Sequence, residues 1–482
     1  MAALAFAALL SACASVQGDV DKILNVPELQ GTRFGLVVMT MDGKELISIR
    51  PDERFVPASN TKLFTVAAAF HRLGNVSQPD PSMGASARIE PRGDGPPDIV
   101  LAGGGDAMLI DADDCERDCL SDLADMVVVN GLTRIGAIFG DDRLFPHEPW
   151  GPGWNQDDLI FRSGAPASAL VVNSNEVVLQ ISPGEKPGDP VRVAWREDDA
   201  YFQLRNEALT VEGDKDTLRI EMLPGDGTVR LYGTMGAAVA PQRIPMAAND
   251  PAVVAALRFQ RLLKERGVEV VGGVQPRHRS LTLADEPKTR GEGVASETPA
   301  GTEIGRLLPP ALLDDLRFLN KQSQNLHAEV LLRRLGLVAG GGSRSEGLAV
   351  IEAMLDEAGA DRGMWDLSDG SGMSTYNRVT PRMVARFLRW TSLQPWSEAF
   401  RSTLAVGGVD GTLSRRFRET PLQGRIFAKT GTLTGTNALA GFMTTAKGQT
   451  LIFSAYANDR PEEAGPATVA LDRALLEIAA AY

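Results

Sequence analysis

The 482-residue chain contains few of the residues on which metal sites and histidine-based catalysis depend. Its three cysteines are too few to complete a zinc site, and no further ligand lies near them. Its four histidines are scattered without the spacing of metal ligands: His71, His147, His278 and His327. We therefore interpret the histidines as structural, and neither a metal nor another cofactor is expected.

Basic stripes and membrane-spanning runs are also missing. The formal net charge is −13, and no cluster of Lys and Arg interrupts the acidic balance, which excludes nucleic acid as a partner. The apolar run over residues 2–10 is too short to span a bilayer. Residues 340–342 are three glycines, but no Gly-Lys-Ser/Thr follows, so they do not form a phosphate-binding loop.

The N-terminus predicts export. Residues 2–10 are typical of the apolar region of a signal peptide, and Leu10-Ser11-Ala12-Cys13 resembles a bacterial lipobox. Cys13 would then be lipidated and become the mature N-terminus, so that residues 1–19 form a signal and tether and provide the only membrane contact. No Lys or Arg precedes the apolar run, and plain cleavage at an Ala-x-Ala-like site is the alternative.

Cys115 and Cys119 are the two cysteines that remain in the mature chain. In an exported protein such a pair often forms a disulfide, and a four-residue spacing can be bridged at a helix end or loop. Two reduced thiols are the alternative.

Three short polar strings together supply what acyl transfer through a serine requires: Ser59-Asn60-Thr61-Lys62, Ser323-Gln324-Asn325 and Lys429-Thr430-Gly431. Ser59 is the candidate nucleophile, and Lys62 lies one helical turn further on, where side chains at i and i+3 meet. Ser323 could relay protons to the leaving group, and Asn325 could orient a peptide backbone. Lys429 is expected to be a fixed cation for an anionic substrate end. This is the SxxK, SxN and KTG set of the penicillin-recognising serine acyltransferases.

The surroundings of these motifs predict where they lie. The apolar run over residues 63–73 predicts a buried helix that starts at a Ser59 cap after a proline. Ser59 would then lie at a helix N-terminus, where free N–H groups stabilise an oxyanion. Lys429 is predicted at the end of a strand over residues 425–428. The backbone N–H groups of Ser59 and Thr432 are the natural oxyanion hole.

Both ends of the chain are predicted to build one α/β catalytic domain, at residues 20–80 and 300–482. A hairpin over residues 34–49 precedes the Ser59 helix. Apolar runs over residues 438–445 and 451–457 predict two strands after the third motif, and residues 467–481 predict a closing helix. More than two hundred residues separate the first two motifs, which is far too long for a loop. Turns and short β-rich runs in this stretch predict two nested, mainly β inserted domains: residues 81–165 with 240–299, and residues 166–239.

The distribution of motifs resembles the class C low-molecular-mass penicillin-binding proteins, the D-alanyl-D-alanine carboxypeptidase/endopeptidase family of penicillin-binding protein 4, or DacB. The resemblance covers nearly the whole mature chain and includes the large insertion after the first motif. Further strings carry it: Gly103-Gly104-Gly105-Asp106, Gly151-Pro152-Gly153-Trp154, Gly164-Ala165-Pro166, Asp369-Gly370-Ser371-Gly372-Met373-Ser374, Gly408-Val409-Asp410-Gly411-Thr412-Leu413 and Ala428-Lys429-Thr430-Gly431-Thr432-Leu433-Thr434-Gly435.

The resemblance implies a penicillin-binding transpeptidase/β-lactamase-like domain that works on peptidoglycan in the periplasm. Ser59 would attack a D-Ala-D-Xaa peptide bond with Lys62 as base, and water would release the acyl group. Ser323 and Lys429 would pass a proton to the leaving amine, while Asn325 would hold the acyl-side amide. β-Lactams would acylate the same serine and deacylate slowly. Further substrate-binding residues would be Thr430, Gly431, Thr432, Ser371 and Met373.

Trp154 and Asp157 match a Trp-x-x-Asp pattern with which members of this family grip a diaminopimelate side chain. In such members an arginine can follow the Asp-Gly-Ser-Gly-x-Ser string, but Thr375 occupies that stretch here and Arg378 lies three residues further on. An amidated or differently bound stem peptide is therefore an alternative. So is a role of Asp157 as a cap or loop carboxylate.

Two other functions share parts of this pattern. A β-lactamase uses the same Ser-Lys pair but needs a dedicated deacylating base, and the sequence offers no clear Glu in a compact insertion. A non-catalytic cell-wall-binding lipoprotein of the same fold is expected to have lost Ser59, Lys62 or Lys429, and all three are present. Trimming of terminal D-Ala and cleavage of cross-links share an acyl-enzyme, so the motifs do not separate these two reactions.

Overall fold

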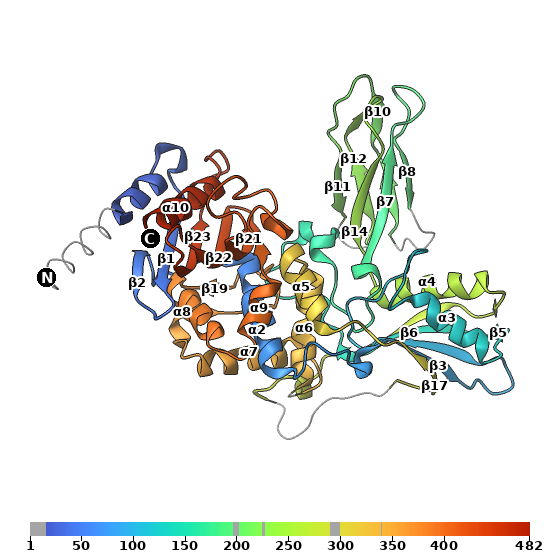
Figure 1. Cartoon of the computed structure of the whole chain (residues 1–482). Coiled ribbons are helices and arrows are strands. Elements are labelled where there is room, and N and C mark those ends of the chain that lie inside the picture. The colour runs from blue at the N-terminus through green and yellow to red at the C-terminus, as the bar shows by residue number, and fades with distance from the viewer. Residues whose placement is uncertain (1–15, 196–201, 224–226, 290–298, 339) are drawn as a thin grey trace, which may run out of the picture.

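The computed structural model describes residues 16–195, 202–223, 227–289, 299–338 and 340–482. Its largest part, which we call domain I (residues 16–80 and 307–482), is built on a six-stranded antiparallel sheet formed by both ends of the chain (Figure 1). The strand order is β2 (Glu45–Ile49), β1 (Arg33–Thr40), β23 (Thr450–Asn458), β22 (Thr436–Thr444), β21 (Ile426–Leu433) and β20 (Ala405–Val406). The predicted hairpin, formed by β1 and β2, and the last strands are confirmed.

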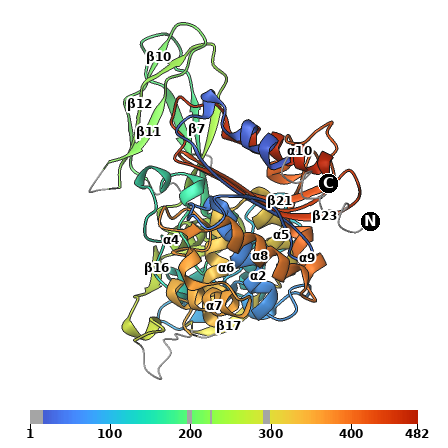
Figure 2. The same ribbon diagram turned by 90° about the vertical axis from the view of Figure 1, so that its left-hand side faces the viewer.

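Helices cover both faces of this sheet, as Figure 2 shows edge-on. Successive residues of a strand point to opposite faces, so Leu451 and Phe453 of β23 pack on one side and Ile452 on the other. The first side is closed by α10 (Ala467–Ala481), which confirms the predicted helix, and by a helix over residues 16–24. The second side is covered by α2 (Lys62–Arg72), α5 (Leu312–Gln322), α6 (Asn325–Leu337), α7 (Arg344–Glu357), α8 (Pro381–Ser392) and α9 (Ser397–Thr403).

Domain II (residues 81–175 and 248–306) has a mixed five-stranded sheet with two helices, α3 (Leu120–Val129) and α4 (Pro251–Glu265). The strand order is β16 (Val274–Arg279), β6 (Ile138–Pro146), β4 (Asp98–Ala102), β3 (Ser86–Glu90) and β17 (Thr302–Arg306). A two-stranded piece joins β5 (Arg134–Ile135) to β15 (Glu269–Val270). The helices make this domain less purely β than the sequence predicted.

Domain III (residues 176–247) projects from domain II (Figure 1). It contains one sheet of β14 (Gln242–Ala247), β7 (Glu176–Ser182) and β8 (Arg192–Trp195). The second sheet is β11 (Arg219–Met222), β12 (Val229–Tyr232) and β9 (Leu204–Asn206), and a third pairs β10 (Leu209–Val211) with β13 (Thr234–Gly236). Apolar side chains from these strands form their own small core.

An α/β fold with two nested insertions is therefore confirmed, but three of the predicted boundaries shift. β17 pairs with β3, so domain II extends past residue 300. β14 pairs with β7, so domain III extends past residue 239. Leu170 and Val172 pack in the core of domain II, so domain III begins with β7 and not at residue 166. Short β-rich runs predicted strands in this part of the chain, but no sequence pattern revealed which strands pair.

Short elements complete the chain. Domain I also holds a two-stranded piece of β18 (Trp365–Asp366) and β19 (Arg378–Val379). The 3-10 turns are η1 (Pro27–Leu29), η2 (Ala58–Thr61), η3 (Pro81–Met83), η4 (Gln156–Asp158), η5 (Arg162–Gly164), η6 (Asn173–Asn175), η7 (Leu283–Asp285), η8 (Arg362–Met364) and η9 (Gly411–Leu413). Across the described ranges, we find no helix with the length and apolarity needed to cross a membrane.

Candidate active site

Ser59 lies in the 3-10 turn η2, directly before α2, and not at a helix cap as the sequence predicted. The N-cap of η2 is Pro57 and that of α2 is Thr61, and neither makes a side-chain capping bond. Ala58 is held at a φ of 47°, in the left-handed region that costs a non-glycine residue about 1–2 kcal/mol. The turn leaves the Ser59 side chain partly exposed while the residues after it enter the core.

The Lys62 amine is buried directly beneath this serine. Its Nζ donates to Ser59 Oγ at 3.0 Å, to Asn325 Oδ1 at 2.6 Å and to the Ser371 carbonyl at 2.6 Å. Burial lowers the pKa of Lys62 from 10.5 to about 7, although the negative charges of Asp369 and Glu329 act to raise it. An amine with this pKa is available as a free base near neutral pH.

Lys429 forms a second serine–lysine pair across the site. Its Nζ donates to Ser323 Oγ at 2.8 Å and to the Thr430 carbonyl at 2.9 Å. Lys429 lies inside β21, which runs on through the third motif, and not at the end of a strand as predicted. Burial, and then the nearby Lys62, hold the pKa of Lys429 well below its usual range.

Close backbone packing fixes η2 between β21 and the loop after β18. Asn60 Nδ2 donates to the Lys429 carbonyl at 2.7 Å. A Cβ on Gly431 would lie 2.7 Å from the Pro57 carbonyl oxygen, and one on Gly372 would lie 1.9 Å from the Ala58 carbonyl oxygen. Glycine at both positions therefore lets two segments approach the serine turn.

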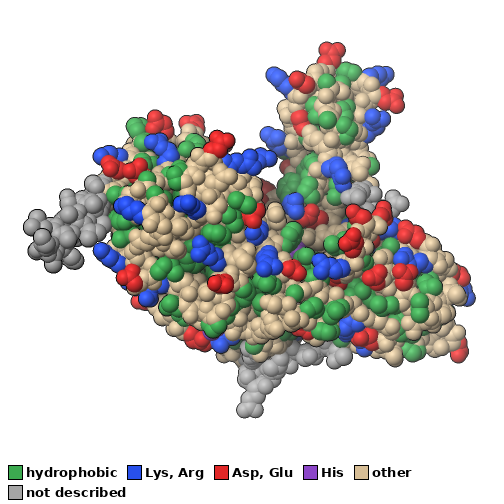
Figure 3. All heavy atoms as spheres, viewed as in Figure 1, with side chains coloured by type: hydrophobic (Ala, Val, Ile, Leu, Met, Phe, Trp, Pro, Cys, Tyr) green, Lys and Arg blue, Asp and Glu red, His purple; other side chains and the backbone are tan. Residues whose placement is uncertain are grey.

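Asn325 joins the site to domain II. Its Oδ1 accepts from Lys62, and its Nδ2 donates to the Ser163 carbonyl at 2.8 Å. Ser323, the C-cap of α5, has a φ of 60°, which turns the chain so that α6 starts at Asn325. A cavity of about 430 Å³ lies beside this turn, and its lining includes Arg162, Ser323 and Asn325. Figure 3 shows the hollow between domain I and the inserted domains that overhang it.

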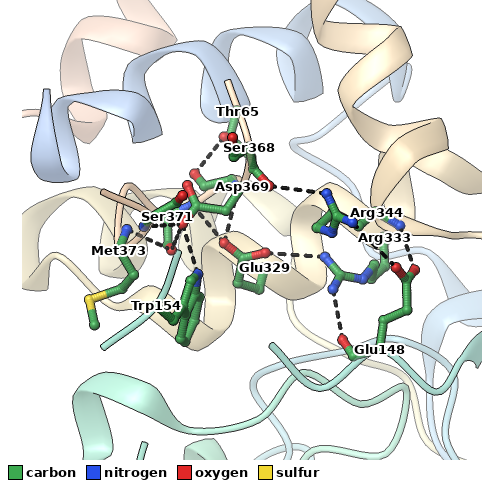
Figure 4. Close-up of polar contacts among 12 residues, drawn as sticks. Thr65, Glu148, Trp154, Glu329, Arg333, Arg344, Ser368, Asp369, Ser371 and Met373 are labelled. Atoms are coloured by element: carbon green, nitrogen blue, oxygen red, sulfur yellow. Dashed lines mark hydrogen bonds and ion pairs between the residues drawn. The ribbon is translucent and has the colours of Figure 1, made fainter. Parts of the chain in front are cut away.

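Buried charges behind the motifs form a network that the sequence analysis did not identify (Figure 4). Asp369 accepts from the backbone N–H groups of Gly372 and Ser374 at 2.9 and 2.6 Å. Burial, and then the negative charge of Glu329, raise the pKa of Asp369 to about 6. Asp369 was visible within the Asp-Gly-Ser-Gly-Met-Ser string, but its role depends on contacts that no spacing reveals.

Glu329 connects this loop to domain II. It accepts from the N–H groups of Gly370 and Ser371 at 2.9 and 2.8 Å, and Arg333 donates to its other oxygen at 3.1 Å. Arg333 also donates to the Glu148 carbonyl of domain II at 2.9 Å. The available sequence signal for this buried pair was a Glu and an Arg four residues apart on the predominantly buried helix α6.

The remaining predicted residues lie around the same site. Thr430 Oγ1 donates to Thr412 Oγ1 at 2.8 Å, and Thr432 is exposed on β21. Ser371 is fully buried, so its carbonyl, and not its hydroxyl, faces Lys62. Met373 is 7% exposed in the same loop.

Trp154 and Asp157, the two ends of the Trp-x-x-Asp pattern, lie in different surroundings. The Trp154 indole N–H donates to Asp369 Oδ2 at 3.0 Å, which holds the domain II loop against the Asp369 loop. Asp157 is exposed in η4. The structure therefore connects Trp154 to the motifs directly and leaves the carboxylate of Asp157 open to solvent.

The cysteines lie away from these motifs. Cys115 and Cys119 are joined by a disulfide in domain II. The lipobox-like string and Cys13 lie outside the described residues.

The two serine–lysine pairs, set at one edge of an α/β sheet with an asparagine between them, define the site of a penicillin-recognising serine acyltransferase. A model of the D-Ala-D-Ala carboxypeptidase 3 (S13) family matches residues 16–477. The chain belongs to this family, which confirms the resemblance to the class C low-molecular-mass penicillin-binding proteins. It is accordingly a serine-type hydrolase and not a binding module that has kept only the fold.

Individual relatives agree with this assignment. The D-alanyl-D-alanine carboxypeptidase of Actinomadura sp. (strain R39) is 33% identical over 479 residues, covering 96% of this chain and 84% of the relative. The carboxypeptidase DacB of Haemophilus influenzae is 24% identical over 450 residues, covering 90% and 88%. The crystal structure of penicillin-binding protein 4 from H. influenzae matches with a TM-score of 0.79 at 22% identity, covering 95% of this chain and 98% of that one.

Gly372→Ala tests whether the approach of the Asp369 loop fixes η2. Alanine would need a φ of +87° and would place Cβ 1.9 Å from the Ala58 carbonyl oxygen. We expect a loss of at least about 2 kcal/mol in the free energy of unfolding and a fall of several degrees in Tm. Gly273→Ala is the control, because its Cβ meets no atom within 4 Å, and its effect should stay within about 0.5 kcal/mol. Equal stability of the two variants would contradict the packing role.

Proposed function

We propose that this protein is a serine-type D-Ala-D-Ala carboxypeptidase and D,D-endopeptidase that acts on peptidoglycan stem peptides and cross-links and is inhibited by β-lactams. The observation that carries the proposal is the contact of Lys62 Nζ with Ser59 Oγ at 3.0 Å, because burial gives this amine a pKa of about 7. Family membership supports the substrate, and a relative's crystal structure, penicillin-binding protein 4 of H. influenzae complexed with a β-lactam, supports the inhibitor.

Acylation begins with proton transfer from Ser59 Oγ to the neutral Lys62 amine. The oxygen then attacks the carbonyl carbon of the D-Ala-D-Xaa bond and forms a tetrahedral oxyanion. The backbone N–H groups of Ser59 and Thr432 are the proposed donors to this oxyanion. Lys62 keeps the transferred proton close to Asn325 Oδ1 and the Ser371 carbonyl, which accept from its Nζ.

Collapse of the oxyanion breaks the C–N bond, and the leaving amine must gain a proton. Ser323 Oγ lies 2.8 Å from Lys429 Nζ, so this pair can deliver one. The terminal carboxylate of the substrate would bind at Lys429, Thr430 and Thr432, and its negative charge would raise the low pKa of Lys429. The bound carboxylate would thus favour the cationic form of Lys429. A water molecule then attacks the acyl carbon and gives a proton to the Ser323–Lys429 pair, which replaces the one delivered to the leaving amine. Lys62 returns its proton to Ser59 Oγ as the ester C–O bond breaks and the shortened peptide is released.

We propose a location outside the cytoplasm, in the periplasm, with lipid attachment at Cys13. Peptidoglycan as substrate and the lipobox-like string over residues 10–13 support this location. The mass of the mature N-terminal peptide tests lipidation directly, because a free amine beyond Cys13 is incompatible with it.

Ser59→Ala tests the proposed function. The substitution removes one oxygen from a partly exposed turn, so the fold should persist while labelling by a fluorescent penicillin disappears. Mass spectrometry of the labelled wild-type protein should place the adduct on Ser59, and an adduct on Ser323 or Ser371 would overturn the assignment. Digestion of purified peptidoglycan by the wild-type protein should yield both D-Ala-trimmed monomers and separated cross-links. Rapid turnover of nitrocefin would instead indicate a β-lactamase.

The pH dependence of acylation should follow the pKa of Lys62. The base is the neutral amine, which predominates above a pKa of about 7 and is protonated below it. The second-order rate constant for penicillin acylation should therefore rise through pH 7 and fall about tenfold per pH unit well below it. A rate constant that stays level between pH 5 and pH 8, measured by stopped-flow fluorescence, would exclude Lys62 as the base in this range.

Asp157→Asn tests the predicted side-chain subsite. A charge-assisted bond from the diaminopimelate ammonium to Asp157 is worth about 1.5–3 kcal/mol, so kcat/KM should fall about tenfold or more for peptides with the free amine. Asp157 is exposed, so the fold should be unaffected. Peptides whose side-chain amine is acetylated, and penicillin acylation, serve as controls and should change little. A parallel fall in all three rates would mean that Asp157 does not select the side chain.

A further inference from the structure

Two histidines that are far apart in the sequence meet in domain II, away from the motifs. His278 lies in β16, and His147 follows the end of β6, which pairs with β16 in parallel. The pairing register shifts between Arg277 and Arg279, and the His147 N–H donates to the Arg279 carbonyl at 2.7 Å. The two imidazole rings consequently lie 4.2 Å apart between centroids. Sequence spacing gave no indication of this pair.

A carboxylate completes a cluster of possible metal ligands. Asp142 Oδ1 in β6 lies 2.8 Å from His278 Nδ1, and one ligand atom each of Asp142, His147 and His278 lie within 4.8 Å of one another. The Asp142 side chain is 5% exposed and the His278 side chain 24%, whereas His147 is exposed. The cluster is thus fixed on its inner side and reachable from solvent on its outer side.

Two further side chains orient these ligand atoms. Asp250 Oδ2 lies 3.2 Å from His278 Nε2, while its Oδ1 accepts from the first N–H groups of α4, those of Ala252 and Val253. Ser168 Oγ donates to Asp142 Oδ2 at 2.9 Å. Metal-bound histidines commonly donate their second ring N–H to a carboxylate, which fixes the ring and leaves the other nitrogen for the metal. Asp250 is placed to do this for His278.

We propose that Asp142, His147 and His278 bind a divalent transition metal ion, with Zn²⁺ favoured by the ligand types. Two imidazoles and one carboxylate suit zinc, which takes three such protein ligands with a water molecule as the fourth. The ion replaces the proton now shared by His278 Nδ1 and Asp142 Oδ1, and that proton is released to solvent. Tetrahedral ligands about 2.0–2.1 Å from zinc lie about 3.3 Å apart, so these two atoms must separate by about half an ångström.

The position of the cluster indicates what the ion does. It would join β6, β16 and, through Asp250, the start of α4. The residue after His147 is Glu148, whose carbonyl accepts from Arg333 and whose carboxylate accepts from the Arg344 N–H of domain I at 3.0 Å. The ion would therefore stiffen domain II beside its contact with domain I. None of its ligands belongs to the proposed acyl-transfer site.

Titration of the metal-stripped, full-length protein with Zn²⁺ alone tests this proposal. Calorimetry should show one ion per chain, and saturation should raise Tm. His147→Ala should abolish both effects without loss of folding, because this histidine is exposed. His71→Ala is the matched control: His71 also lies beside a carboxylate, that of Glu357, but on domain I, and this variant should bind zinc like the wild type.

Asp250→Ser separates ligand orientation from helix capping. Serine also caps helices, so the cap of α4 is kept and the metal-free variant should still fold. Loss of the carboxylate that orients His278 should weaken zinc binding about 10- to 100-fold.

The proposal is overturned if the wild-type protein takes up no ion per chain, or if His147→Ala binds as tightly as His71→Ala. The first result would leave His278 as a histidine held between Asp142 and Asp250 by hydrogen bonds alone. Penicillin labelling, measured alongside, reports on the acyl-transfer site independently.

Discussion

The burial of two lysine amines in one site is the constraint on which the rest of the catalytic domain depends. Lys62 and Lys429 are both fully buried, and each contacts a serine hydroxyl. Removing an ammonium group from water costs several kcal/mol unless partners compensate, so such groups shift their pKa instead. The fold thereby lowers the pKa of both amines, and it lowers that of Lys62 to about 7, where the amine can accept a proton near neutral pH. No histidine is needed for this chemistry.

Two nearby carboxylates limit how far burial lowers the pKa of Lys62. Asp369 and Glu329 act to raise the pKa of Lys62, against the larger effect of its burial. The two carboxylates are themselves held by backbone N–H groups of the loop over residues 370–374, so they remain buried at modest cost. Arg333 balances one of them and continues the network to domain II. The pKa of Lys62 therefore depends on residues that do not contact the nucleophile.

The sequence predicted the parts of this site whose chemistry is carried by residue type and order. Ser59 with Lys62, and Ser323 with Asn325, were identifiable because each pair lies two or three residues apart in a short motif. The α/β class, the terminal helix and the last strands followed from apolar periodicity. The sequence did not reveal the 3-10 turn at Ser59, since a serine after a proline and before an apolar run has the same pattern as a capped helix.

Contacts between distant segments were not predictable for a physical reason. The role of Glu329 depends on its hydrogen bonds with the N–H groups of Gly370 and Ser371. The domain boundaries, likewise, follow from the strand pairing of β14 and β17. The expectation that all four histidines are structural rested on spacing along the chain. Spacing does not detect His147 and His278, because a parallel strand pair brings them together. In each case the structure depends on contacts between segments that are distant in the sequence, and a local pattern does not show which segments meet.

Domain II helps to fix the geometry of the acyl-transfer site through hydrogen bonds to domain I. Ser163 accepts a hydrogen bond from the same Asn325 amide group whose oxygen accepts from Lys62. Trp154 donates to Asp369, and Glu148 accepts from Arg333. Three residues from one stretch of the insertion, residues 148–163, thus hold three residues that orient or tune the lysine base. A shift of domain II by even an ångström would break hydrogen bonds at all three points, because such bonds weaken steeply with distance. Rigidity of the insertion is consequently a condition for the acyl-transfer geometry, and the disulfide and the histidine cluster both lie within the domain that must be rigid.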